Sequence, residues 1–142
     1  SRFDIEAAFD ADPSTPFKSY VDQAALVDDI YSFDNSKFGI SDQEAIRMDP
    51  QQRLAVECAY EAMVSAGLAE EPTKASTKLS LRNIKMSKVG VYVGMMTNDW
   101  AKMNHGAPSP FTATGHSPAI AANRISYLLG LTGPSMTVDT AC

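Results

Sequence analysis

The sequence of 142 residues contains little cysteine and little histidine, with two residues of each. Two cysteines, Cys58 and Cys142, are too few for the disulfide framework of a small secreted protein. Cys58 lies inside a helical pattern, which predicts a small buried hydrophobic residue. Two histidines without a cluster of cysteine and histidine give no support for a zinc site, so we expect no metal.

Long apolar runs and runs of basic charge are also missing. No stretch approaches the roughly 18 apolar residues of a membrane-spanning helix, and the N-terminal "SRFDIEAAFDADPSTPF" has no apolar core of a signal peptide. The net charge of −5, without a basic run, argues against nucleic acid as the main partner. The composition is that of a soluble globular protein, 44% hydrophobic and 20% charged, with a length that suits one domain.

Helix signals are clearest in "SDQEAIRMDPQQRLAVECAYEAMVSAGL". Ser41 is predicted to cap a short helix, with Glu44 three residues later. Asp49 is predicted to cap a longer helix, with Pro50 in its first position and Gly67 at its end. Apolar residues cover most of this longer helix, so we expect it to be mostly buried. Its narrow polar stripe consists of Arg53, Glu57, Glu61 and Ser65.

The rest of the chain predicts further elements. Residues 1–40, rich in aromatics, are expected to form loop and short helix packed on a core, and residues 69–88 a surface loop. The apolar runs "VGVYVG" and "GPSMTVDT" predict two buried strands. Between them, "MMTNDWAKMNHG" suggests a loop with one helical turn, and Ser117, Pro118 and Gly130 delimit another helix. The order helix, strand, helix, strand predicts an α/β layered fold.

The second predicted strand runs into Asp139, Thr140, Ala141 and Cys142. If a helix follows, the cysteine lies on a strand-to-helix turn, where the helix dipole lowers the thiol pKa. Backbone N–H groups at such a turn also hold a developing oxyanion, which is the arrangement of a nucleophile elbow. A single cysteine after a strand is more often a buried structural residue than a nucleophile. Other segments of the sequence must therefore decide between these two interpretations of Cys142.

Four segments in order resemble the N-terminal part of the β-ketoacyl synthase (ketosynthase) domains of type I polyketide and fatty acid synthases. The resemblance covers nearly the whole chain, with its main gap at residues 69–88. The segments are "RFDIEAAFDADPSTPFKSY", "FDNSKFGISDQEAIRMDPQQRLAVECAYEAM", "VGVYVG" and "ANRISYLLGLTGPSMTVDTAC". The resemblance implies a thiolase-like α/β fold of two similar halves, in a homodimer. Residues 1–142 would be a partial domain that lacks the first strand and everything after the active-site cysteine.

The resemblance also implies an activity, that of an acyltransferase making 3-oxoacyl chains. Cys142 falls on the family's nucleophile, which takes an acyl chain from an acyl carrier protein as a thioester. A malonyl-type extender on a carrier protein then decarboxylates, and its enolate attacks the thioester. The family needs no intrinsic cofactor beyond the phosphopantetheine arm of its carrier protein. Its partners are that carrier protein and the acyltransferase domain of the same megasynthase, and its location is the cytoplasm or a plastid.

Further positions take their expected roles from the same resemblance. Asp99 and Trp100 match a segment near the substrate entrance and dimer interface, and Thr112 and Thr114 lie in "PFTATG", a stretch that reaches towards the acyl pocket of the partner subunit. These four residues are candidate substrate-binding residues.

Structural roles near the site are implied for four more residues. Asp139 and Thr140 are expected to shape the turn before the nucleophile. Asn123 and Arg124 are expected to be structural, with Arg124 a buried or interface charge held by hydrogen bonds.

The family's two enolate-stabilising histidines follow the nucleophile. His105 and His116 precede Cys142 and match neither of them, so both are interpreted as ordinary loop residues.

Several alternatives stay open or are disfavoured. The segments "DPQQRLAVE" and "ANRISYLLGLTGPS" favour a polyketide synthase over a fatty acid synthase. A thiolase is disfavoured by the "MDPQQR" and "GPSMTVDTAC" blocks, and a chain-length-determining partner by the intact cysteine. A non-elongating homologue, or a module for docking or dimerisation, remains the non-condensing alternative.

The sequence starts without methionine and stops at the predicted nucleophile, so we expect a piece of a longer protein. The 142-residue polypeptide alone is expected to be inactive and poorly soluble. A terminal carboxylate beside Cys142 would disfavour the thiolate, and an uncovered sheet face would promote aggregation.

Overall fold

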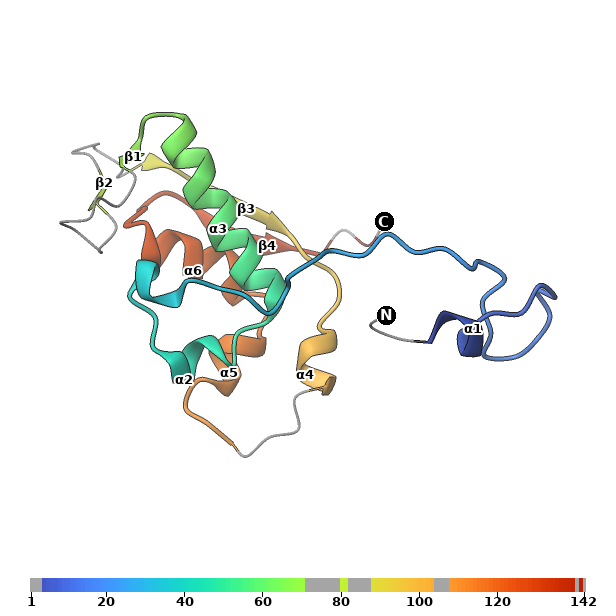
Figure 1. The fold of residues 1–142 in the computed structure, drawn as a ribbon. Coiled ribbons are helices and arrows are strands. Elements are labelled where there is room, and N and C mark those ends of the chain that lie inside the picture. The colour runs from blue at the N-terminus through green and yellow to red at the C-terminus, as the bar shows by residue number, and fades with distance from the viewer. Residues whose placement is uncertain (1–3, 71–79, 82–87, 104–107, 140, 142) are drawn as a thin grey trace.

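The computed structural model describes residues 4–70, 80–81, 88–103, 108–139 and 141 of the chain. Its helices are α1 (Ile5–Ala8), α2 (Asp42–Ala45), α3 (Pro50–Ser65), α4 (Asp99–Met103), α5 (Thr112–His116) and α6 (Ile120–Leu128), with a 3-10 helix at Asn35–Phe38. Its strands are β1 (Ala69–Glu70), β2 (Ser80–Leu81), β3 (Val91–Gly94) and β4 (Ser135–Val138). After residue 88 the order is β3, α4, α5, α6 and β4, so three helices connect the two strands, in keeping with the predicted α/β fold (Figure 1).

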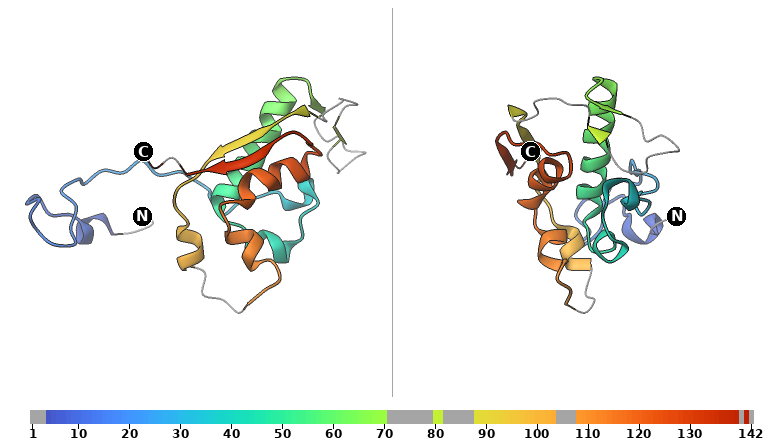
Figure 2. Two further views of the ribbon diagram at one scale, coloured as in Figure 1. Left: turned by 180° about the vertical axis from the view of Figure 1, so that it is seen from behind. Right: turned by 90° about the vertical axis from the view of Figure 1, so that its left-hand side faces the viewer.

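The body of the molecule is built around two helices and one pair of strands. α6 contacts α3 on one side and both β3 and β4 on the other, so it lies in the middle of the body (Figure 2). Buried side chains from α3, α6 and the segment around Phe38 make one apolar core. Its members are Phe38, Ile40, Met48, Val56, Tyr60, Ala69, Ile125, Leu129 and Leu131, and Val89, Val91 and Val93 pack against it. Burial of these side chains is the main term that holds the elements together.

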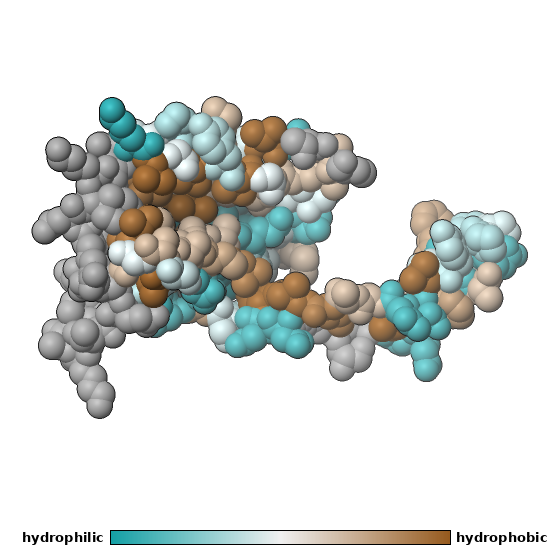
Figure 3. Space-filling view, turned by 90° about the horizontal axis from the view of Figure 1, so that it is seen from above, coloured by the Kyte–Doolittle hydropathy of each residue, from teal (hydrophilic) through white to brown (hydrophobic). Residues whose placement is uncertain are grey.

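The N-terminal segment differs from its prediction. Residues 4–30 extend away from the body as an arm that carries α1, instead of packing on the core (Figure 1). Large apolar side chains of the arm are exposed, including Phe17, Tyr20 and Val27. Figure 3 shows the arm separated from the body, with hydrophobic atoms on the surface of both. The large aromatic side chains Phe17 and Tyr20 of the arm therefore lie outside the core, whereas Phe33 and Phe38 of the same predicted segment do pack on it.

The predicted caps of α2 and α3 are confirmed. The Ser41 hydroxyl accepts the Glu44 N–H at 3.2 Å, and the Asp49 carboxylate accepts the Gln51 N–H at 2.8 Å. Each bond satisfies an amide that the first helical turn leaves unpaired. Pro50 begins α3, and the helix ends before Gly67, whose φ of 68° is the left-handed value of a helix terminus.

Burial of α3 does not follow its apolar pattern. Cys58, predicted to be buried, is exposed, and Ala62 is exposed as well. Arg53, assigned to the polar stripe, is buried with an exposed fraction of 6%. Its guanidinium donates two hydrogen bonds to the Met48 carbonyl, at 3.1 and 2.8 Å, which compensate part of its desolvation. The expectation of a mostly buried α3 is therefore wrong, because the face around Cys58 has no packed neighbour in the described chain.

The strands also show differences from the sequence patterns. The loop predicted at residues 69–88 contains the antiparallel pair β1–β2, with Ala69 buried; most of that loop lies outside the described residues. β3 and β4 are parallel, in the register Val91 with Ser135 and Gly94 with Val138. Both were predicted as buried, but each alternates, so Tyr92 and Met136 face outwards at 64% and 48% exposure. One face of the pair packs on the core and the other is open.

The helical turn predicted within residues 95–106 is confirmed as α4.

The start of α6 is not where the sequence placed it. Ser117 ends α5, and α6 begins after Ala119 without a side-chain cap. His116, interpreted as a loop residue, is the last residue of α5, while His105 lies outside the described residues.

Candidate active site

The carboxyl ends of β3 and β4 meet at one edge of the strand pair, because the strands are parallel. The Met95 amide, which follows β3, donates to the Val138 carbonyl at 3.1 Å and extends the pairing to the end of β4. From this edge one chain segment continues to α4 and the other to Asp139 and Ala141. In open α/β sheets, ligands and reactive groups gather outside this edge. We therefore take it as the candidate site.

The chain turns sharply where β4 ends. The Asp139 carboxylate accepts the Ala141 N–H at 3.0 Å, which closes an Asx turn. Ala141 has φ of 53°, a left-handed conformation that is uncommon for alanine and changes the direction of the chain. Cys142 and Thr140, the predicted nucleophile and its neighbour, lie outside the described residues.

Helix α5 and the start of α6 lie at the same edge. The Ala122 N–H donates to the Thr137 hydroxyl of β4 at 3.2 Å, which places the first turn of α6 beside the end of β4. Asn98, four residues after β3, donates through its amide to the His116 carbonyl at the end of α5. The segments that lead into α4 and out of α5 are thus joined at the carboxyl edge of the strands.

A polar cluster at the first turn of α3 holds these segments. The Asp49 N–H donates to the Gly115 carbonyl at 2.9 Å, and Gln51 Nε2 donates to the Thr97 carbonyl at 3.0 Å. Gln52 Nε2 donates to the carbonyls of Thr114 and Ser117, at 3.2 and 3.1 Å. We call Asp49, Gln51 and Gln52 the α3 cluster. It links the core helix to both flanks of the candidate site.

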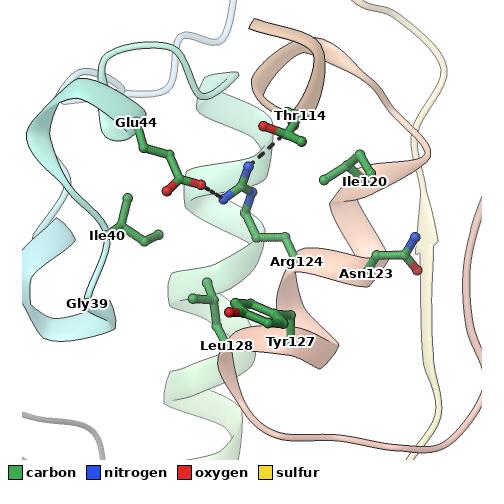
Figure 4. Close-up of a pocket in the computed structure, with 9 residues that line it drawn as sticks. All are labelled: Gly39, Ile40, Glu44, Thr114, Ile120, Asn123, Arg124, Tyr127 and Leu128. Carbon is green, nitrogen blue, oxygen red and sulfur yellow. Dashed lines mark hydrogen bonds and ion pairs between the residues drawn. The ribbon is translucent and has the colours of Figure 1, made fainter. Parts of the chain in front are cut away.

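Arg124 confirms the prediction of a buried charge held by hydrogen bonds. Its exposed fraction is 8%, and its guanidinium forms an ion pair with Glu44. Nε donates to Gln52 Oε1 at 3.0 Å, and Nη2 donates to the Thr114 carbonyl at 3.4 Å. Figure 4 shows the side chain reaching from α6 between Glu44 and Thr114. The positive charge is balanced by Glu44, as burial of a guanidinium requires.

An open pocket of about 370 Å³ lies beside this ion pair. It brings three predicted site residues together: Thr114, Asn123 and Arg124 (Figure 4). Thr112 and Asp139 are not in its lining; the Thr112 hydroxyl accepts the Ser109 N–H at 3.1 Å. The other lining residues are Gly39, Ile40, Glu44, Ile120, Tyr127 and Leu128.

Asp99 and Trp100 lie on α4, away from the lining of this pocket. Asp99 is exposed. The Trp100 indole donates to the Arg47 carbonyl at 3.1 Å, and its ring lies 5.4 Å from the Arg53 guanidinium. This contact has the geometry of a cation–π interaction. Trp100 thus anchors α4 to the start of α3.

Sequence reasoning missed Gln52, Glu44 and Asn98 as residues that organise the site. A signal was present for Gln52, because two glutamines stand in the first turn of a helix that is otherwise polar only along one narrow stripe, in the quoted "MDPQQR" block. Buried amides of this kind need partners, and such partners come from other segments. Asn98 carried a local signal as well, since it directly precedes α4 and its Oδ1 accepts the Ala101 N–H at 3.2 Å, but nothing in the sequence marked its bond to the His116 carbonyl, 18 positions away.

The described residues contain no group of three or more histidine, cysteine, aspartate or glutamate side chains placed to hold a metal ion. In the same residues, no helix is both long enough and apolar enough to cross a membrane.

Burial raises the pKa of the Asp49 carboxyl above its ordinary value of 3.8, although the Gln51 N–H and the charges of His116 and Arg53 oppose the shift. The folded state therefore binds the proton of Asp49 more tightly than the unfolded chain. The stability that this provides is complete below pH 3.8 and is lost as the pH rises through the raised pKa.

We expect Asp49→Asn, which keeps a capping oxygen, to remove this pH dependence. The melting midpoint of the wild type minus that of the variant should fall as the pH rises from about 3 to about 7. Thermal unfolding of both proteins across this range measures the difference. A difference that stays constant, or that grows with pH, contradicts the raised pKa.

Comparison with known proteins identifies the family. The family described as "Beta-ketoacyl synthase, N-terminal domain" matches residues 1–142, and the chain belongs to this family. The chain is 40% identical over 140 residues to a type I polyketide synthase of phenolphthiocerol synthesis from Mycobacterium bovis, covering 99% of this chain and 6% of that protein. It is 44% identical over 132 residues to cyclo-acetoacetyl-L-tryptophan synthase of Aspergillus oryzae, covering 91% of this chain and 3% of that protein.

Solved ketosynthase structures share the fold. An oxazolomycin ketosynthase domain of Streptomyces albus matches with a TM-score of 0.70 and 29% identity, over 98% of this chain and 23% of that one. The ketosynthase from module 6 of the bacillaene synthase of Bacillus subtilis matches with a TM-score of 0.60 and 35% identity, over 82% of this chain and 18% of that one. The predicted α/β fold of thiolase-like type, restricted to its N-terminal part, is confirmed.

Proposed function

We propose that this chain belongs to a ketosynthase of a type I polyketide synthase, an acyltransferase that extends acyl chains by decarboxylative Claisen condensation. One observation supports this most directly. The parallel pair β3–β4 ends at a single edge, and the Asp139 turn after β4 is followed in the sequence by Cys142, which the resemblance matches to the family's nucleophile. We further propose that residues 1–142 are the N-terminal part of one such domain.

The proposed reaction has two steps. First, the Cys142 thiolate attacks the carbonyl of an acyl thioester, and the thiol of the carrier protein's phosphopantetheine arm leaves. Second, a malonyl-type extender loses carbon dioxide, and the resulting enolate attacks the acyl carbon on Cys142. The cysteine thiolate then leaves, and the chain has grown by two carbons. Backbone N–H groups next to the nucleophile would stabilise the oxyanion of each tetrahedral intermediate.

The proposed partners follow from this reaction. The acyl carrier protein supplies both thioesters, and an acyltransferase domain loads the extender. We also propose that the enzyme is a homodimer in the cytoplasm. The residues proposed to lie near the bound acyl chain are Asp99, Trp100, Thr112 and Thr114. Those proposed to have structural roles beside it are Asn123, Asp139 and Thr140. The relatives reported above are named for the synthesis of polyketides and of an acetoacetyl-tryptophan product. They support the polyketide assignment over fatty acid synthesis.

Acylation and condensation can be tested separately on the full-length protein that the gene encodes. We expect incubation with acyl thioesters to add one acyl group to Cys142, detected by mass spectrometry of the peptide. Addition of malonyl carrier protein should then release carbon dioxide and a 3-oxoacyl product. Acylation without extension would overturn the condensing activity and favour the non-elongating alternative. Absence of acylation would overturn the nucleophile assignment as well.

A further inference from the structure

Arg53 carries a buried positive charge that no carboxylate of the described chain pairs with. Its exposed fraction is 6%, and among the described residues no carboxylate lies within ion-pair distance of its guanidinium. Arg124, by contrast, is paired with Glu44. Burial lowers the pKa of Arg53, although the charges of Asp49 and Glu57 oppose the shift. A guanidinium stays charged in proteins, so part of its desolvation cost is left for another partner to offset.

The guanidinium also has donors to spare. Nε and Nη2 donate to the Met48 carbonyl, and Nη1 donates to the Tyr31 carbonyl at 3.4 Å. Because a guanidinium has five N–H groups, one on Nη1 and one on Nη2 are left without an acceptor in the described part of the chain. N–H groups on the two terminal nitrogens form the fork that binds both oxygens of a carboxylate.

Arg53 lines an open cavity of about 370 Å³, which we call the Arg53 pocket. Its other lining residues come from residues 31–35 and from α2 with its C-cap, and they are Tyr31, Phe33, Asn35, Asp42, Ala45 and Ile46. The pocket shares no lining residue with the pocket beside Arg124. Its volume falls at the lower end of the range for small-molecule sites, about 300–1,000 Å³. Its aromatic and aliphatic walls suit a ligand with a small apolar body.

Asp42 is the other charged residue of the Arg53 pocket. It is exposed, and its carboxylate accepts a hydrogen bond from Asn35 Nδ2 at 2.8 Å. Water and salt screen an exposed charge, whereas a buried charge acts through a medium of lower dielectric constant. We therefore expect Arg53 to dominate the potential in the pocket. One buried positive charge, opposed in part by Asp42, suits a ligand with a single negative charge.

We propose that the Arg53 pocket binds a small organic acid, whose carboxylate pairs with the Arg53 guanidinium and whose apolar body lies against Phe33 and Ile46. The ligand is a monocarboxylate, and the binding is not covalent. The inference does not depend on the proposed condensing function, because none of the lining residues takes part in the proposed reaction.

Benzoate is the probe, and hydrogen exchange of the full-length protein is the measurement. Benzamide has the same shape without the charge, so it is the matched control ligand, and sodium chloride keeps the ionic strength constant. We expect benzoate to slow exchange in residues 31–35 and 42–46. A ligand of this size should reach half of its effect at about 1 to 10 mM. Benzamide should need at least about tenfold more, because it lacks the charge-assisted pair.

Two results with the wild type overturn the proposal. One is the absence of protection in both segments at about 50 mM benzoate, well above the expected range. The other is equal protection by benzoate and benzamide, which would leave no role for the Arg53 charge. In either case the proposed function stands.

Substitutions of Ile46 locate the bound carboxylate without disturbing the core. Ile46 is 65% exposed, so both variants are expected to fold. Ile46→Glu adds a negative charge at the edge of the Arg53 pocket, and Ile46→Gln is the control of the same size without the charge. We expect benzoate to bind about fivefold more weakly to Ile46→Glu than to Ile46→Gln, by repulsion between the two carboxylates. Equal affinities would place the benzoate elsewhere and overturn the proposal.

Arg53→Lys tests the fork itself, because lysine keeps the charge but not the paired N–H groups. We expect it to bind benzoate at least about fivefold more weakly than the wild type. If Arg53→Lys does not fold, Asp42→Asn replaces it, since Asp42 is exposed and asparagine keeps an acceptor for Asn35. Removal of the opposing charge should strengthen benzoate binding about threefold. An unchanged affinity in the variant that is measured overturns the proposal.

Discussion

Replacement of Cys142 by alanine is expected to abolish acylation and condensation, with a loss of at least about 10³-fold in rate. The thiol is the proposed nucleophile, and residues that act as one catalytic unit typically cost this much or more when one member is removed. Mass spectrometry of the full-length protein after incubation with an acyl thioester measures the bound acyl group directly. The acyl group should be absent from the variant and present in the wild type.

Cys58→Ala is the matched control for this experiment. Cys58 is a free and exposed cysteine on α3, outside the α3 cluster and the pocket lining. An exposed thiol reacts with thioesters only to the extent that it ionises. We expect Cys58→Ala to retain wild-type acylation and condensation. Acyl transfer that survives in Cys142→Ala but disappears in Cys58→Ala would exclude Cys142 as the nucleophile.

Replacement of Gly115 by alanine is expected to be the most destabilising small change near the site. A Cβ atom there would lie 2.3 Å from the Arg47 carbonyl oxygen and 2.8 Å from its carbon. These are backbone atoms just ahead of α3, so no side-chain rotation relieves the clash. Overpacking of this kind costs about 3 kcal/mol. Hydrogen exchange of the α3 and α6 amides under mild denaturant measures the local loss of stability.

Gly94→Ala is the control, because its Cβ would meet nothing within 4 Å. Gly94 ends β3, on the same sheet edge, and its replacement should change the stability by less than about 1 kcal/mol. Equal effects of the two substitutions would contradict the close contact between α5 and the residues before α3. A large effect confined to Gly115→Ala supports the packing that places α5 at the edge.

The contrast between Asp49 and Arg53 shows which local features the sequence could predict. Asp49 was identified as a helix cap because capping depends on neighbouring residues, which the sequence lists directly. Arg53 was assigned to a polar stripe, since its charge suggested solvent. Its burial depends on the Met48 carbonyl and the Trp100 ring, and only the folded chain brings that ring close.

The candidate site likewise contains residues that the sequence could predict and contacts that only the folded chain shows. Asp139 and Cys142 were assigned from the resemblance of a contiguous block to the family, and the Asx turn at Asp139 is a local hydrogen bond. Thr114 and Arg124 were assigned separately, without a reason for them to meet. They share one network because Arg124 donates directly to the Thr114 carbonyl and because Gln52 bonds to both, 62 positions from Thr114 and 72 from Arg124.

The sequence by itself determined the elements whose signals are local: the caps of α2 and α3, the strand before Cys142, and the blocks that place the chain among the β-ketoacyl synthases. Tertiary structure alone decided that Cys58 is exposed, that the aromatic arm leaves the body, and that Gln52 and Arg124 hold α5 at the sheet edge. The physical reason is that capping and strand formation depend on near neighbours. Burial and hydrogen bonding of a side chain depend on which distant segments fold against it.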